Sequence, residues 1–380
     1  MRFTVNRDVF SEAVSFAVKL LPQRPTQPLL SGALIEASAG EITISSFDYE
    51  VSSRTVVTAD VQEPGRALVS GRLLGDIANR LPQADVIITL LDGRVTVKCG
   101  SASFSLPSMP VEEYPQIPRV DTVSGLVPAD AFADAVSQVG AAASKDDVTP
   151  VITGVQFEVT QNSLTLTATD RYRVAIRGID WENSNGGEEL TALVPSKIVT
   201  EVGKTFASSG QVQVSIVRND ERELIAFTGG NKTVTSLLIK GNYPPVRRLF
   251  PETVDNYAVV NTADLIEATN RVGLVLEREA ALRFSFREGS VTLEAAGSET
   301  AQASETIDAH LAGEEMTVSL KPQFLLDGLR STHSEFARIA FTRTDNPSKP
   351  GPVLITSQRS KDEASDESFR YLLQPNLLLR

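Results

Sequence analysis

The chain has 380 residues, of which 41% are hydrophobic and 22% are charged. This length predicts two or three domains, and this composition excludes an intrinsically disordered chain. With 48 acidic and 36 basic residues the net charge is −12, which argues against a conventional basic DNA-binding domain unless the basic residues gather on one surface.

Targeting signals are not evident in the sequence. Residues 1–8 contain no long apolar stretch and no small-residue cleavage site, and apolar runs elsewhere fall short of the roughly 20 residues that span a bilayer. The single cysteine, Cys99, has no partner for an intrachain disulfide, which agrees with a reducing compartment. We therefore expect a cytoplasmic protein.

In chain order, the first segment predicts two helices among strands. FSEAV at residues 10–14 lies on the first helix, and Asn6 and Asp8 suit its N-cap or first turn. Period-two alternation predicts strands at 42–45 and 95–98, on either side of a helix at 72–81. The proline-rich stretch 114–118 then indicates a linker.

The same order of elements returns twice. The second unit has FADAV at 132–136, strands at 164–167 and 212–215, a helix at 196–205 and a proline-rich end at 243–246. The third has LIEAT at 265–269, a strand at 291–294 and a helix at 323–330. Residues 344–369, rich in Ser, Asp, Lys and Pro, predict a solvated loop before the last strand. Further N-cap or first-turn candidates are Asp130, Asn261, Thr262 and Asp264.

The repeat length is that of a whole domain. From Phe10 to Phe132 it is 122 residues. We interpret the chain as α+β, with three domains of one fold at residues 1–118, 119–251 and 252–380, each with two helices on antiparallel strands. The alternative is a duplication that left three similar domains without a common function.

Several motifs, in this order and spacing, resemble the bacterial β sliding clamps, particularly their actinobacterial members, over nearly the whole chain. They are RPT at 24–26, PLLSG at 28–32, SFDYEV at 46–51, FSLP at 104–107, ATDRYRVA at 168–175 and YPPVRR at 243–248. The resemblance implies three DNA-clamp domains and a head-to-tail homodimer, whose six domains close into a ring around DNA. It further implies contacts between Phe104 and the partner subunit's Leu274 and Val275, for which ordinary core packing is the alternative.

A ring would reconcile the acidic net charge with DNA binding. Bases on the helices that line the channel would attract phosphates regardless of sequence, while an acidic exterior repels DNA. Each base alone is more often a solvated helix residue, and aromatic residues that some members carry near residues 145–151 are absent here. The expected DNA-contacting bases are Arg7, Lys19, Arg24, Arg72, Arg80, Lys197, Lys204, Arg271, Lys321 and Arg330.

The resemblance also implies a pocket that binds short peptides of the replicative polymerase, the clamp loader and repair proteins. Aliphatic and aromatic peptide side chains would enter an apolar site, with Arg orienting the peptide. Alternatively these residues only complete a strand over 164–177 and the linker. The expected pocket residues are Ile152, Thr169, Arg171, Tyr172, Arg173, Val174, Pro244, Arg248, Leu249, Leu372, Leu373, Gln374, Pro375 and Asn376.

The chain end departs from the family pattern. Family members finish with Met-Pro-x-Arg-Leu, whereas this sequence reads Gln374-Pro375-Asn376 followed by LLLR at 377–380. Replacing apolar walls by unpaired amides costs about 1–3 kcal/mol on binding. We therefore expect altered peptide or inhibitor specificity, as in a specialised or inhibitor-tolerant copy.

Catalytic signatures are sparse, so we expect a non-catalytic protein without cofactor or metal. His310 and His333 have no ligand-spaced partner, and no Gly-rich phosphate loop is present. A nuclease that holds Mg²⁺ on Asp48 and Asp170 is the enzymatic alternative, although Gly297 stands near that place in the third repeat and Asp is a common turn residue. A scaffold that does not bind DNA is the other alternative.

Overall fold

The structure is a computed structural model that describes residues 1–218, 222–296, 301–343 and 350–377. Gly297, residues 344–349 of the expected loop and the last three residues of the unusual chain end lie outside this part. Within it the chain divides into two compact units, residues 1–127 with 208–238 and residues 128–207 with 239–380. No helix in the described ranges is long and apolar enough to cross a membrane.

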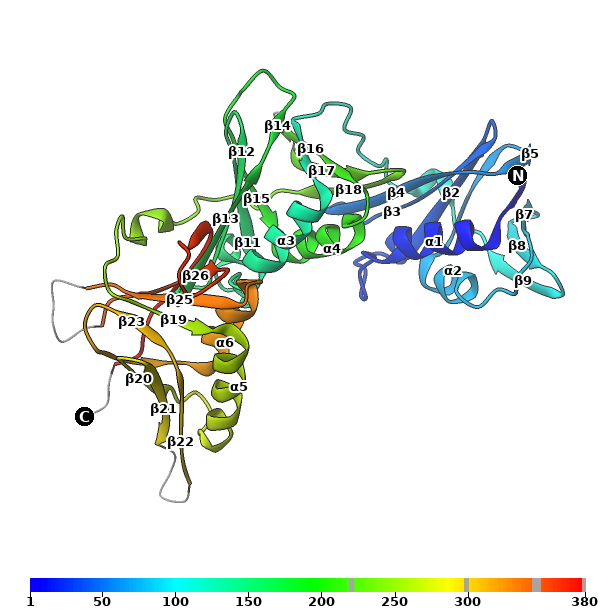
Figure 1. The fold of residues 1–380 in the computed structure, drawn as a ribbon. Coiled ribbons are helices and arrows are strands. Elements are labelled where there is room, and N and C mark those ends of the chain that lie inside the picture. Colours follow the sequence, from blue (N-terminus) through cyan, green and yellow to red (C-terminus); the bar gives the residue numbers. More distant parts are fainter. Residues whose placement is uncertain (219–221, 297–300, 344–349, 378–380) are drawn as a thin grey trace. The chain divides into compact units, whose positions relative to one another are not determined.

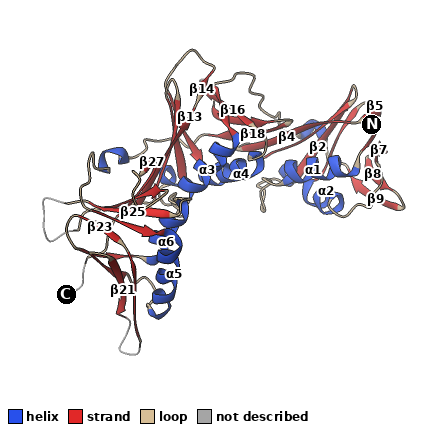
Figure 2. Cartoon of the chain, in the orientation of Figure 1, coloured by secondary structure: helices blue, strands red, loops and turns tan. Residues whose placement is uncertain are grey.

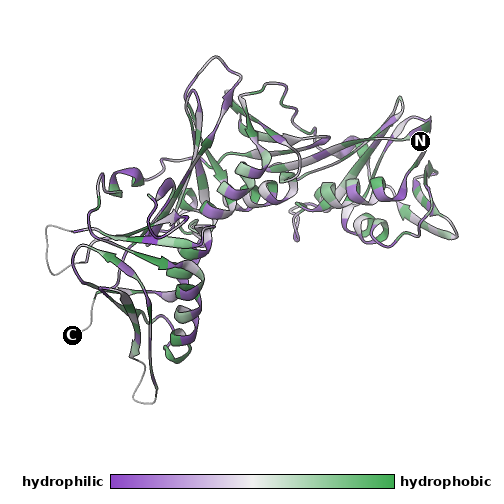
Figure 3. Cartoon of the chain, in the orientation of Figure 1, coloured by the Kyte–Doolittle hydropathy of each residue, from purple (hydrophilic) through white to green (hydrophobic). Residues whose placement is uncertain are grey.

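The described residues form six α-helices, two for each repeat, as the sequence predicts (Figure 1). Asn6 and Asn261 accept hydrogen bonds from backbone N–H groups of the first turn, which confirms them as N-caps, whereas Asp130 lies in the first turn after Pro128. The helices carry both apolar and polar residues, as expected for elements with one face on a sheet (Figure 3). Their bounds are α1 Arg7–Val18, α2 Gly71–Ala78, α3 Ala129–Gly140, α4 Ser196–Phe206, α5 Thr262–Val272 and α6 Pro322–Ser331.

The first unit combines α1 and α2 with antiparallel sheets (Figure 2). One sheet has the order β5-β1-β7-β8-β9, and the other contains the order β10-β16-β17-β18-β4-β3-β2-β6. A buried cluster that includes Phe3, Phe10 and Leu74 fills the space between helices and strands. The strands are β1 Arg2–Val5, β2 Gly32–Ser38, β3 Glu41–Phe47, β4 Val51–Thr58, β5 Asp60–Glu63, β6 Gly65–Ser70, β7 Val86–Leu91, β8 Arg94–Cys99, β9 Ala102–Pro107, β10 Gly125–Pro128, β16 Gln211–Arg218, β17 Glu223–Gly229 and β18 Lys232–Leu237.

The second unit holds the remaining helices, and these contact one another in the order α4, α3, α6, α5. Its large sheet has the order β15-β11-β12-β13-β27-β26-β25-β19-β23, and a smaller sheet has the order β22-β21-β20-β24. The strands are β11 Gly154–Val159, β12 Ser163–Thr169, β13 Arg173–Asp180, β14 Glu182–Asn183, β15 Leu190–Pro195, β19 Tyr257–Asn261, β20 Leu282–Arg287, β21 Ser290–Ala296, β22 Gln302–Asp308, β23 His310–Ala312, β24 Met316–Leu320, β25 Phe336–Phe341, β26 Val353–Gln358 and β27 Asp366–Leu373.

The strand orders repeat with the sequence. The orders β4-β3-β2-β6, β13-β12-β11-β15 and β22-β21-β20-β24 are equivalent, and so are β5-β1-β7-β8-β9 and β23-β19-β25-β26-β27. Successive repeats join by the same kind of edge, because β18 pairs with β4 and β27 pairs with β13. Pairing removes unsatisfied edges at these places. Strand β9 is the equivalent of β27, and β22 is the equivalent of β4 and β13. Both β9 and β22 are edge strands of their sheets.

Two expectations from the sequence are wrong. Residues 344–369 do not form a single solvated loop, because β26 lies inside that range and its residues are all buried. The expected strand over 164–177 is a hairpin, since β12 and β13 are separate antiparallel strands joined at Asp170–Tyr172. In the first case the buried run follows Pro350, Gly351 and Pro352 and is followed by polar residues. In the second, a short turn interrupts otherwise continuous strand residues.

The linker after the first repeat is anchored by a buried tyrosine. The hydroxyl of Tyr114 accepts a hydrogen bond from the backbone N–H of Phe47 at 2.8 Å. Tyr114 packs with Phe47, Leu34 and Leu68 in a small apolar cluster. Burial raises the pKa of the Tyr114 hydroxyl to about 12. The proline-rich stretch is therefore part of the packed fold of the first unit.

Candidate functional site

Most of the expected DNA-contacting bases lie on or beside helices and are exposed. Arg72 lies on α2, Lys197 and Lys204 on α4, and Arg330 on α6. Each of these four bases is exposed on a helix, and the helices contact one another within each unit. The others at helix ends or in loops are Lys19, which ends α1, Arg80, just after α2, and Arg24, in the loop after α1.

Three other expected DNA-contacting bases already form hydrogen bonds or ion pairs within the chain. Arg7 is half-buried and donates a hydrogen bond to the carbonyl of Leu81 at 3.1 Å. Arg271 pairs with Glu305 at 2.6 Å, which raises the pKa of its guanidinium above the usual value. Lys321 pairs with Glu279 at 2.8 Å. These three bases are therefore less available to phosphates than the exposed lysines of α4.

The residues of the expected peptide pocket surround the β12–β13 hairpin and its junction with β27. Val174 of β13 stands opposite Leu372 of β27, and Thr169 of β12 stands opposite Val174. Opposed residues share a face of the sheet. On this face Val174 and Leu372 pack with Val246 from the segment that carries Pro244, Arg248 and Leu249.

This face combines a buried apolar floor with an exposed rim. Leu249, at the end of the 3-10 helix Val246–Leu249, is 53% exposed, and Arg248 beside it is also exposed. Tyr243 is held close by, because its hydroxyl donates to the carbonyl of Thr167 at 3.5 Å and burial raises its pKa. An exposed leucine and an arginine beside apolar side chains suit an aliphatic peptide segment.

Arg173 and Leu373 face the opposite side, toward α6. The Arg173 side chain is 7% exposed and pairs with Asp170 at 3.0 Å and with Asp327 of α6 at 2.6 Å. Its guanidinium also donates to the Tyr371 hydroxyl at 3.1 Å. Burial opposes the charge of Arg173, but Tyr371 and Asp327 favour it more strongly and raise the pKa of the guanidinium above its usual value. Arg173 therefore fixes the hairpin to α6 in this structure.

The hairpin turn and the chain end meet at the rim. Tyr172 is 59% exposed, and its backbone carbonyl accepts a hydrogen bond from the N–H of Gln374 at 2.9 Å. The exposed side chain of Gln374 donates to the carbonyl of Pro350 at 3.4 Å. Asn376 pairs through its backbone with Ser319. Ile152 is buried, and Arg171 donates a hydrogen bond to the Thr149 hydroxyl.

The sequence did not single out Phe324, Asp327 or Tyr371. Their contacts with the hairpin and with one another span 47 to 198 residues along the chain. The one signal in the sequence is indirect, since a buried arginine requires an acidic partner. Nothing in the spacing identifies Asp327 as that partner.

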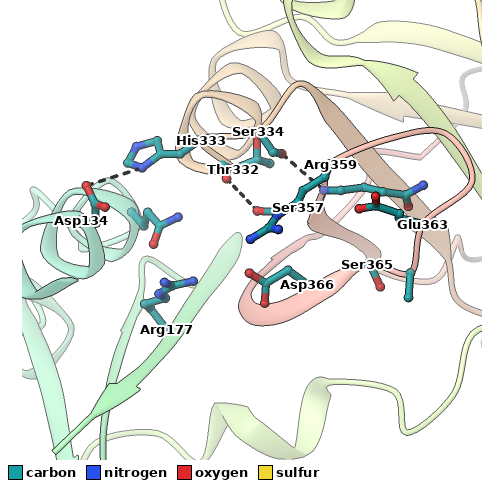
Figure 4. A pocket seen from close by; sticks show the side chains of 13 residues that line it. Asp134, Arg177, Thr332, His333, Ser334, Ser357, Arg359, Glu363, Ser365 and Asp366 are labelled. Atoms are coloured by element: carbon teal, nitrogen blue, oxygen red, sulfur yellow. Dashed lines mark hydrogen bonds and ion pairs between the residues drawn. The ribbon is translucent and has the colours of Figure 1, made fainter. Parts of the chain in front are cut away.

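A cleft of about 490 Å³ in the second unit was also not predicted (Figure 4). Asp134 of α3 and His333, after α6, face each other at 4.0 Å. Burial opposes the charge of Asp366, but Ser368 and the guanidinium groups of Arg177 and Arg359 outweigh burial and lower its pKa. Acidic and basic side chains thus compensate one another in this cleft.

The acids of the enzymatic alternative are used in backbone turns. Asp48 accepts hydrogen bonds from the N–H groups two and three residues further on, and Asp170 does the same. Among the residues that the structure describes, no group of three or more His, Cys, Asp or Glu side chains is arranged to hold a metal ion. The geometry of these two residues offers no support for a Mg²⁺ site.

Comparison with known proteins gives a consistent result along the chain. Models of the DNA polymerase III beta subunit match at residues 1–118 (N-terminal domain), 126–245 (central domain) and 247–364 (C-terminal domain). The chain is 42% identical to the beta sliding clamp of Streptomyces coelicolor over 376 residues, covering 99% of each chain. It is 37% identical to the beta sliding clamp homolog GriR of Streptomyces muensis over 375 residues, again covering 99% of each. Its fold is similar to the crystal structure of the Bacillus subtilis sliding clamp, with a TM-score of 0.90, 26% identity and 100% of both chains covered.

Proposed function

Because the chain belongs to the family of bacterial DNA polymerase III β subunits, the β sliding clamps, and is of the actinobacterial type, we propose that it encircles duplex DNA as a processivity factor. In this role it tethers the replicative polymerase and other replication and repair proteins to DNA in the cytoplasm. It acts as a non-catalytic subunit and needs a separate ATP-driven loader.

The observation that carries this proposal is the repeated junction between strand edges. In the chain β18 pairs with β4 and β27 pairs with β13, so the last strand of one repeat meets the same strand of the preceding repeat. By the same rule β9 would meet β22 of a second copy. A heterologous contact of this kind that closes on itself yields a finite ring. We assign residues 1–118, 119–251 and 252–380 as the three domains of each subunit.

Exposed apolar residues support that closure. Phe104 lies on β9 and is 38% exposed, although β9 pairs with β8 on one side. Leu274 is 83% exposed and follows α5, whose Arg271 is tied to Glu305 of β22. Large apolar side chains with such exposure favour an interface. Phe104 therefore meets the partner's Leu274 and Val275 at the proposed dimer contact.

Charge supports topological retention on DNA. The net charge of −12 opposes tight binding to phosphates, while exposed bases on the helix side give local attraction without sequence preference. Weak affinity is sufficient for a closed ring because DNA cannot leave it sideways. Arg24, Lys197 and Lys204 are the best placed contacts, since Arg271 and Lys321 are already paired.

Partner proteins would dock through short peptides at the hairpin face. Val174 and Leu372 supply an apolar floor, and Leu249 and Arg248 supply the exposed rim. Arg173 and Leu373 support this surface from behind, Thr169 extends its buried floor, and Tyr172 and Gln374 shape its edge.

The chain end would alter the specificity of this surface. Gln374 and Asn376 place two amides just after β27, which would make this copy a variant with changed peptide or inhibitor preference. We predict that Gln374→Met and Asn376→Met each tighten binding of a clamp-binding peptide by about tenfold, or roughly 1.4 kcal/mol. Fluorescence anisotropy measures this, and Gln161→Met, at an exposed turn, is the control. Unchanged affinity in both variants would remove the reason for this proposal.

Primer extension tests the processivity role. A primed single-stranded circle is copied by a replicative polymerase with its loader and ATP, with or without this protein. We expect long products from single binding events only when the protein is present. Equal product lengths with and without it would overturn the proposal.

A further inference from the structure

One aromatic ring on α6 lies between the proposed peptide surface and a proposed DNA-contacting base. The Phe324 ring stacks on the ring of Tyr172, with centroids 5.7 Å apart and an interplanar angle of 23°. The Arg173 guanidinium lies 4.6 Å from the centroid of the same ring, and the Lys321 ammonium lies 5.8 Å from it. These distances are within the range of attractive aromatic and cation–π contacts.

The two sides of this contact differ in burial. Arg173 is buried and fixed by Asp170 and Asp327, so it sets the position of the ring. Tyr172 is 59% exposed, so a docked peptide would bury it further and favour its stacked position on Phe324. Peptide docking therefore changes how firmly the Phe324 ring is held.

Lys321 contacts the same ring. It precedes α6 at the N-cap position, and its ammonium is shared between the carboxylate of Glu279 at 2.8 Å and the Phe324 ring. The side chain is 29% exposed, so it can reach a phosphate only from this restricted position. When the Phe324 ring is held in place, the Lys321 ammonium stays near that position. The lysine side chain then loses less conformational entropy when it contacts a DNA phosphate.

We propose that Phe324 is a positioning residue that couples peptide docking at Tyr172 to DNA contact by Lys321, so that a bound peptide strengthens the hold on DNA. This inference rests on the proposed function, since it requires both ligands. Coupling of this kind is reciprocal, so DNA must tighten peptide binding by the same factor. Polymerase docking would then increase the affinity of the closed dimer for the DNA that is being copied.

The coupling factor can be measured with the intact protein at low salt. The probes are a short fluorescent linear duplex and a synthetic clamp-binding peptide, and Kd for DNA is determined with and without saturating peptide. We expect a factor of about 5 to 10 for the unmodified protein, at the lower end of typical allosteric coupling. The same factor should appear in Kd for peptide with and without DNA.

Variants separate the positioning role from a general effect on folding. Phe324→Leu should reduce the factor to one, Phe324→Tyr should keep it, and Phe336→Leu, at another half-buried phenylalanine of the same repeat, should also keep it. Lys321→Gln removes the other end of the link and should reduce the factor to one as well, which provides the test if Phe324→Leu does not fold.

The outcomes distinguish the two proposals. If the unmodified protein binds neither probe, the proposed function fails and the coupling fails with it. If it binds both with a factor of one, or if Phe324→Leu and Lys321→Gln retain the original factor, the proposed function stands and the role of Phe324 is overturned.

Discussion

Asp170 makes the same turn as Asp48, 122 residues earlier in the chain. Each carboxylate accepts hydrogen bonds from the backbone N–H groups two and three residues further on. The residue after each aspartate has a positive φ, 75° at Tyr49 and 79° at Arg171, which is uncommon outside glycine. The repeat therefore extends to the conformation of single residues, and both aspartates have the same role in a backbone turn.

Gly328 allows α6 to approach β27 closely, which predicts a large effect of a single methyl group. A Cβ at this position would lie 2.6 Å from the Tyr371 ring, which is itself fully buried. We expect Gly328→Ala to destabilise the second unit by about 1–3 kcal/mol through overpacking. Thermal unfolding followed by circular dichroism measures the change.

Gly273→Ala is the matched control for that substitution. Gly273 ends α5 with a φ of −64°, and a Cβ there meets nothing within 4 Å. This variant should be neutral or slightly stabilising. Equal destabilisation by both variants would contradict a specific role of the Tyr371 contact.

The sequence predicts the repeats well because their signals are local. Helix caps such as Asn6 and the period-two strands depend on neighbouring residues, and both occur where expected. The side of the sheet that each site residue faces is harder to predict. Arg173 and Val174 are consecutive residues of β13 and therefore face opposite sides, but the partner that lets Arg173 occupy the buried side is Asp327, 154 residues further along the chain. Strand β26 was missed because this short run lies between a Pro-Gly-Pro segment and a polar one.

Dimer closure depends on exposed apolar side chains, so a charge there should separate the subunits. We expect Phe104→Asp or Leu274→Asp to yield monomers at concentrations at which the unmodified protein is dimeric, because an unpaired carboxylate would be buried at the interface. Analytical ultracentrifugation measures this. Leu91→Asp, at a 68% exposed leucine of the first repeat, is the control and should leave the dimer intact. Dimers in all three variants would exclude this interface.

DNA attraction should depend on exposed helix bases in proportion to their number. Removing Lys197 and Lys204 together should lower affinity for duplex DNA and reduce the slope of log K against log salt concentration by about 0.9 for each phosphate that is no longer neutralised. Arg283→Gln, on strand β20, should leave the slope unchanged. Arg271→Gln should have a smaller effect than Lys204→Gln, because Glu267 and Glu305 already pair with Arg271. A slope that does not respond to Lys197 and Lys204 would contradict the assignment.

The raised pKa of Tyr114 predicts that the free energy of unfolding falls at high pH. Burial raises the pKa of its hydroxyl to about 12 in the folded chain, from an ordinary value of about 10. Between these values the folded state binds more protons than the unfolded state, so the free energy of unfolding falls as pH rises through this window. Tyr114→Phe should reduce that dependence while lowering stability at neutral pH by about 1 kcal/mol, since the Phe47 N–H loses its partner. Chemical unfolding at a series of pH values tests both effects.

Topological retention on DNA is the most direct measurement of the proposed function. The labelled protein is loaded onto a closed circular duplex, separated from free protein by gel filtration and then treated with an enzyme that cuts the circle once. We predict that the protein stays with the circle and is released after linearisation, because a ring slides off an open end. Equal retention on both forms, no retention on either, or degradation of the DNA in the presence of Mg²⁺ would contradict the account.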